Sequence, residues 1–203
     1  MEYDISEISK YIQIARENHI KGNLHQANEI YKKLINQKIY TYDLLISYGL
    51  FNKDINNLEI SKNLLLLSIK KYPLKIKPYI LIADILRKEN KLNDALKTLK
   101  AAKKIEKFNS DIDYNFAITY KTIKLFQEAI ISIDAALKQQ PENQIYKILK
   151  ADILIESFQD EEAKKLLLNL NFSKDSILFF QREILLAKIF INEKEFKLSE
   201  EVL

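Results

Sequence analysis

Small side chains recur at a spacing of thirty-four residues along the chain. One column of small residues comprises Ala27, Ser61, Ala95, Ala129 and Ala163. A second column lies twelve residues upstream and comprises Ala15, Gly49, Ala83, Ala117 and Ala151. Eleven of the thirteen alanines fall in these columns, in their continuation at Ala187 after a two-residue slip, or in a third column with Ala102 and Ala136. A period of this length predicts an array of similar supersecondary repeats rather than a domain with one central core.

Large apolar residues keep the same period and indicate what each repeat is. One large column, four residues after the first small column, comprises Tyr31, Leu65, Leu99, Ile133 and Leu167. Within each repeat the apolar residues recur every three or four positions in two runs, which is the pattern of amphipathic helices. Only 2 glycines and 3 prolines occur. We therefore predict two antiparallel helices per repeat, with the small residues at the helix crossing, where a missing side chain lets the backbones approach.

In these respects the chain resembles the tetratricopeptide repeat family. That family has a 34-residue helix-turn-helix unit with small residues at positions 8, 20 and 27, a large apolar residue at 24 and often proline at 32, where this chain has Pro73 and Pro141. The resemblance implies an all-α, right-handed superhelical solenoid of antiparallel helix pairs. The expected repeats are 8–41, 42–75, 76–109, 110–143, 144–179 with a two-residue insertion, and 180–203, which is incomplete.

The sequence also predicts local features at the two ends of the array. Asp4 and Glu7 are spaced as a capping box at the start of the first helix. In the sixth repeat, the polar residues 192–195 should form the turn before a second helix that stops early, at Leu203. Because solenoids normally end in a polar capping helix, we interpret the sequence as the amino-terminal part of a longer protein, and an uncapped end as a surface for self-association.

Composition excludes several classes of protein. There is no cysteine, hence no disulfide framework, and the amino terminus carries acidic residues where a secretory signal would be basic. The most apolar stretch, 63–69, is too short to span a membrane. A net charge of +4 on 203 residues gives no strong case for nucleic acid as a partner. We expect a cytoplasmic protein without a membrane span.

The resemblance also implies a binding surface, because in this family the first helices of successive repeats line a concave groove. Position 5 is apolar throughout, and position 12 is basic in the first four repeats. The candidate groove residues are Ile12, Arg16, His19, Ile46, Leu50, Lys53, Ile80, Asp84, Arg87, Tyr114, Asn115, Ile118, Lys121, Ile148 and Asp152. Either the position 5 residues are exposed and bind a peptide or amphipathic segment with apolar anchors and acidic flanks, or they pack between neighbouring first helices as core.

Two specialised forms of the groove are not expected. The chaperone-tail binders hold a terminal carboxylate with lysine and asparagine at fixed positions, where the first three repeats have Ile12, Arg16, Ser47, Lys77 and Leu81. We therefore predict no carboxylate clamp. The O-linked N-acetylglucosamine transferase array carries an asparagine ladder at position 6, where this chain has a single asparagine, Asn115.

No pattern in the sequence indicates catalysis, a cofactor or a metal. The two histidines, His19 and His25, straddle a turn without a carboxylate at a suitable spacing, and no glycine-rich phosphate loop occurs. We therefore predict a non-catalytic protein-protein interaction scaffold. An alternative is the substrate-recruiting, amino-terminal region of a larger glycosyl-, sulfo- or methyltransferase. A helical-repeat RNA binder is a third option, which the thirty-four-residue period and the mild charge disfavour.

Overall fold

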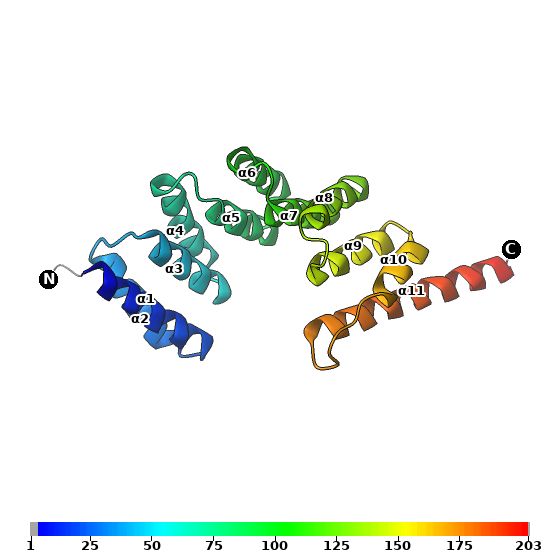
Figure 1. Ribbon diagram of the computed structural model, residues 1–203, viewed down its shortest axis with the longest axis horizontal. Coiled ribbons are helices and arrows are strands. Elements are labelled where there is room, and N and C mark those ends of the chain that lie inside the picture. The colour runs from blue at the N-terminus through cyan, green and yellow to red at the C-terminus, as the bar shows by residue number, and fades with distance from the viewer. Residues whose placement is uncertain (1–3, 203) are drawn as a thin grey trace. The chain divides into compact units, whose positions relative to one another are not determined.

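The structure, a computed structural model, describes the backbone of residues 4–202 and the side chains of residues 4–194. This part of the chain is helical and contains no strand. It divides into two compact units, Met1–Glu106 and Lys107–Leu203, called here the N-terminal and C-terminal units. The all-α array of helix pairs expected from the sequence is confirmed (Figure 1).

The N-terminal unit holds the first three repeats as three antiparallel helix pairs, coloured blue to green in Figure 1. Its helices are α1 (Ile5–Ile20), α2 (Leu24–Asn36), α3 (Tyr42–Asp54), α4 (Leu58–Lys71), α5 (Lys77–Lys88) and α6 (Leu92–Ile105). Each helix packs most closely on the other member of its pair, α1 on α2, α3 on α4 and α5 on α6. The boundaries expected at 41/42 and 75/76 lie between these pairs, whereas the start expected at residue 8 lies inside α1.

The C-terminal unit holds two further pairs and one long helix. These helices are α7 (Ser110–Thr122), α8 (Phe126–Gln139), α9 (Gln144–Glu156), α10 (Asp160–Leu168) and α11 (Ile177–Val202). The pairs α7 with α8 and α9 with α10 repeat the arrangement of the N-terminal unit, and α11 packs on α9 and α10.

The small columns meet at the helix crossings, as the spacing predicts. In the second repeat the Ser61 hydroxyl donates a 2.7 Å hydrogen bond to the Gly49 carbonyl. A Cβ atom added to Gly49 would lie only 3.1 Å from Cδ2 of Leu65, the large residue of the same repeat. In the fourth repeat Ala117, Ala129 and Ile133 are fully buried in one cluster. Small residues thus set how closely the helices approach, and the large residue fills the space beside them.

The turn between the two helices of a repeat has the same geometry five times. One residue in each turn adopts the left-handed conformation, with φ between 58° and 79°: Gly22, Asn56, Asn90, Lys124 and Phe158. The following N–H bonds to the carbonyl five residues back, from Asn23 to Asn18 at 2.8 Å and from Gln159 to Leu154 at 2.9 Å. This is the Schellman motif. Side chains other than glycine and asparagine pay roughly 1–2 kcal/mol for this conformation, so the packing of the array determines the turn at Phe158.

Two expectations about the ends are wrong. The α1 N-cap is Asp4, but its side chain caps no backbone N–H and instead accepts a 2.7 Å hydrogen bond from the Ser6 hydroxyl, so no capping box forms. In the sixth repeat, residues 192–195 make no turn, because α11 continues to Val202. The residue equivalent to the left-handed turn residues is Lys194, between two glutamates, and all three are good helix formers. After the two-residue slip, the small column would continue at Ser199 and the large column at Leu203. Both residues lie outside the described side chains.

The described part of the chain contains no helix long and apolar enough to cross a membrane.

Candidate functional site

The apolar residues at position 5 are mostly core. In the N-terminal unit Ile12 and Ile46 are buried and Ile80 is half-buried. In the C-terminal unit Ile148 is buried and Tyr114 is half-buried. Of the two alternatives left open by the sequence, Ile12, Ile46 and Ile148 follow the one in which position 5 is core. Neighbouring first helices contact each other directly, α1 with α3 and α7 with α9, and the branched side chains between them lose their exposure.

Two of the basic residues at position 12, Lys53 and Lys121, form ion pairs with the next repeat. The Lys53 ammonium lies 3.0 Å from a carboxylate oxygen of Asp84, which also accepts from Arg87 at 3.1 Å. In the C-terminal unit Lys121 pairs with Asp152 and, at 2.9 Å, with Glu156. Both interhelical pairs join residues thirty-one apart, that is, position 12 of one repeat and position 9 of the next. The basic row is consequently neutralised and does not form an unpaired cationic surface.

The first repeat also contacts the second, but without the pair between positions 12 and 9, because position 9 of the second repeat is Leu50. Arg16 donates a 2.8 Å hydrogen bond to the Ser47 hydroxyl and lies 3.6 Å from Asp43. The His19 ring packs edge-on against Phe51, with 5.1 Å between ring centroids, and its Nε2 lies 3.5 Å from Asp54. These contacts hold both side chains against α3.

Charge pairing changes the acidity of the buried groups. Burial alone would raise the pKa of Asp84, but the Lys53 hydrogen bond and the charges of Lys53 and Arg87 outweigh burial and hold the pKa below its usual value. For Lys121, burial alone would lower the pKa, and the hydrogen bonds to Asp152 and Glu156 instead raise it. Both pairs therefore stay ionised at neutral pH.

We expect Asp84→Asn to cost roughly 1 kcal/mol of unfolding free energy at neutral pH, because Lys53 and Arg87 lose a charged acceptor. A carboxyl whose pKa is lowered by folding stabilises above its unfolded pKa, here 3.8, and this stabilisation is lost as the pH falls through the folded value. The difference in unfolding free energy between wild type and Asp84→Asn should therefore be smaller at about pH 3 than at neutral pH. Urea unfolding of both proteins at the two pH values measures it, and an equal difference at both would show that the pair contributes nothing.

The remaining predicted residues divide by exposure. Asn115 is buried and donates a 2.8 Å hydrogen bond to the Asp111 carbonyl, so it supports α7 rather than facing a partner. Leu50 and Ile118 are half-buried. His25 is exposed near the start of α2. Among the described residues no three histidine, aspartate or glutamate side chains gather as a metal site would require.

A hollow in the N-terminal unit brings some of the predicted residues together. It has a volume of about 430 Å³ and lies between α1 and α3, with Lys77 from the start of α5. Arg16, His19, Ile46 and Leu50 line it together with Asp54. Three of its polar side chains, Arg16, His19 and Asp54, already make contacts within the unit, as described above.

A second groove lies in the C-terminal unit. It has a volume of about 300 Å³ and lies between α7, α9 and α11. The residues of this C-terminal groove are Tyr114, Ile145, Ile148, Leu149, Asp152, Gln181, Ile184, Leu185 and Lys188. Ile145 and Ile184 are exposed, and the Tyr114 ring is fixed by stacking on Tyr146 at 4.9 Å between centroids. The groove therefore has rigid aromatic and aliphatic walls beside the Asp152 carboxylate.

The candidate residues predicted from the sequence include three of the nine residues of this groove, Tyr114, Ile148 and Asp152, and omit the other six. Two of the omitted residues, Ile145 and Gln181, stand at position 2 of the fifth and sixth repeats. One turn of helix separates position 2 from position 5, so the two positions share a face. That spacing is the signal that could have found them.

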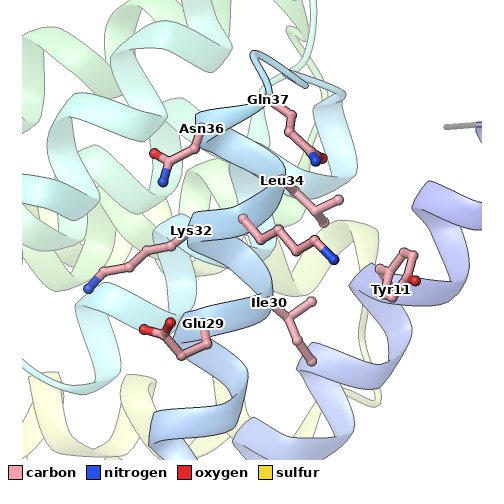
Figure 2. Close-up of a pocket in the computed structure, with 8 residues that line it drawn as sticks. Tyr11, Glu29, Ile30, Lys32, Leu34, Asn36 and Gln37 are labelled. Atoms are coloured by element: carbon pink, nitrogen blue, oxygen red, sulfur yellow. The ribbon is translucent and has the colours of Figure 1, made fainter. Parts of the chain in front are cut away.

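A larger hollow lies elsewhere, around α2. It has a volume of about 710 Å³, and Figure 2 shows Tyr11 of α1 opposite Ile30 and Leu34 of α2. The Lys33 ammonium lies 5.7 Å from the centre of the Tyr11 ring. In the second repeat the residues equivalent to Tyr11 and Ile30, Leu45 and Leu64, are buried. The hollow therefore lies on the face of the first repeat that is equivalent to a buried face of the second.

The sequence matches no known protein family by profile and no curated protein. Solved structures do match. A thermophilic TPR protein of Thermus thermophilus is 12% identical and superposes with a TM-score of 0.76, covering 89% of this chain and 99% of that one. A crystal structure of MamA is 16% identical with a TM-score of 0.64, covering 79% and 88%. The MamA RS-1 ArsTM double mutant is 13% identical with a TM-score of 0.64, covering 88% and 93%. Together with the thirty-four-residue helix pairs, these likenesses show that the chain has the fold of a tetratricopeptide repeat protein.

Proposed function

We propose that the chain is a protein-binding module and that its C-terminal groove takes a peptide or helical segment of another protein. The observation that carries the proposal is the groove itself, where exposed Ile145 and Ile184 flank the fixed ring of Tyr114. A concave surface with a few apolar anchors and one or two charged groups is the usual form of a peptide-binding site. In this proposal the chain binds a partner and performs no chemistry itself.

The charges of the groove define the partner further. Asp152 is held by Lys121, and Lys188 lies 3.5 Å from the same carboxylate. Because the positive and negative groups already satisfy one another, an acidic partner gains little from them. We therefore propose a partner segment whose apolar side chains fill the groove, in place of the acidic flanks expected from the sequence.

Replacing Ile145 by glutamate tests the proposal. Ile145 is 50% exposed in the first turn of α9, where an acidic residue favours the helix dipole, so the fold should persist. A charge among the apolar anchors should weaken partner capture from a lysate of the source organism roughly tenfold or more. Quantitative mass spectrometry of the captured proteins measures this effect.

Ile131→Glu is the matched control, because Ile131 is 61% exposed on α8 and lines neither groove nor hollow named here. Circular dichroism should show both variants as helical as wild type. A partner retained by Ile131→Glu and lost by Ile145→Glu supports the proposal. If all three proteins capture the same set equally, the C-terminal groove is not the binding site.

A further inference from the structure

Helix α11 is apolar on two opposite sides. Leu185 and Ile189 are buried against α9 and α10. The other side is exposed and carries residues spaced alternately by three and four, which we call the α11 stripe: Ile177, Phe180, Ile184, Ala187 and Ile191. The exposed fraction of its four large members ranges from 57% to 76%. Because the buried side is held by the C-terminal unit, α11 cannot rotate to cover the stripe.

The preceding repeat shows what normally covers this face. Ala151 of α9, the equivalent of Ala187, is fully buried in a cluster with Ala163 and Leu167 of α10. Ala187 is exposed, because α11 runs on as one helix through Val202 and the described chain folds no second helix back onto it. The face is thus built for a helix that this part of the chain does not supply.

The spacing and side chains of the stripe indicate which helix fits. Alternation of three and four residues is the heptad seam of a coiled coil. Its first positions hold Ile177, Ile184 and Ile191, and its fourth positions hold Phe180 and Ala187. In a parallel coiled coil, the residue immediately before each first position of the heptad lies beside the partner helix. There it faces the residue whose number is five higher. In α11 these residues are Glu183 and Lys188, which have opposite charges and half-exposed side chains. Within the unit Glu183 lies 2.7 Å from Arg182 and Lys188 lies 3.5 Å from Asp152, so a pair across the seam has to replace or share these contacts.

We propose that two copies of this chain associate in parallel through the α11 stripe. The seam buries the exposed isoleucines and Phe180, and Glu183 of each copy pairs with Lys188 of the other on both edges. A two-fold interface uses the same patch on both subunits, and this stripe meets that condition because its charges complement themselves. The inference does not depend on the proposed function, although Ile184 lies on both surfaces.

Sedimentation equilibrium over a concentration series tests the association. The wild-type protein should approach twice the monomer mass of 23.9 kDa. Phe180→Glu places a charge in the seam and should remain a monomer, whereas Ile131→Glu, a similarly exposed apolar residue outside the stripe, should dimerise like wild type. The groove variant Ile145→Glu should also dimerise, so failure of the groove proposal would leave this result intact. A wild-type protein that stays monomeric throughout overturns the inference.

Charge exchange tests the orientation. Glu183→Lys and Lys188→Glu each create like charges across the seam and should each raise the dissociation constant about tenfold or less, since the pairs are half-exposed. The double variant restores opposite charges and should recover the affinity of wild type. Recovery of this kind is specific to the parallel register. A double variant no better than either single one would exclude the parallel pair.

Discussion

Replacing Ile133 by alanine is expected to lower the free energy of unfolding of the C-terminal unit by about 2–5 kcal/mol. Ile133 is fully buried in one cluster with Ala117, Ala129, Tyr146 and Ile153. Its removal leaves a cavity that the rigid helix crossing cannot close, since small residues already bring the α7 and α8 backbones together. Urea unfolding followed by circular dichroism measures the loss.

Ile131→Ala provides the control for this experiment. Ile131 lies two residues away on the same helix but is exposed, so the same chemical change should alter the stability by no more than about 0.5 kcal/mol. Similar losses in the two variants would mean that the face of α8 assigned to the core is wrong.

The second large effect is expected for Ala117→Leu, which should destabilise the C-terminal unit by about 1–3 kcal/mol. The structure gives the reason in the second repeat, where a Cβ on Gly49 would already lie 3.1 Å from Leu65. Ala117 and Ile133 hold the same two places in the fourth repeat. A leucine at position 117 therefore has no space beside Ile133, and urea unfolding should show an earlier transition.

Combining the two changes tests whether these residues share one space. The leucine added at position 117 should fill part of the cavity left by Ile133→Ala, so the double variant should lose less stability than the sum of the single variants, by about 1 kcal/mol or more. Circular dichroism must first confirm that the double variant is helical. Strict additivity would mean that positions 8 and 24 do not contact each other, and the packing described for the repeat would be wrong.

The helix pairs could be predicted from the sequence because their cause is periodic. Ala129 and Ala163 are small where two backbones must approach, and Ile133 and Leu167 are large where a gap must be filled, so the pattern of volumes reproduces the pattern of crossings. The continuity of α11 could not be read in this way. Lys194 falls where the period demands a turn, yet Lys124 accepts the turn conformation in the fourth repeat. The identity of the residue does not decide between helix and turn at this position.

The candidate site was harder to predict than the fold. The same apolar pattern at position 5 gives buried Ile148 and exposed Ile184, because exposure depends on how neighbouring first helices pack and not on residue type. The ion pairs, in contrast, could have been predicted from the sequence. Lys121 and Asp152 stand thirty-one residues apart, as Lys53 and Asp84 do, so positions 12 and 9 of successive repeats are partners. Reading the two rows as partners would have removed the expectation of an acidic ligand.

A photo-crosslinking amino acid at position 145, compared with the same residue at position 131, tests the binding role most directly. Both sites are exposed isoleucines, and irradiation in the source cells joins only molecules that lie against the chosen residue. Our account predicts that position 145 yields a discrete crosslinked partner protein and that position 131 does not. If the two positions yield the same products, or position 145 yields none while position 131 does, the C-terminal groove is not where this protein binds its partner.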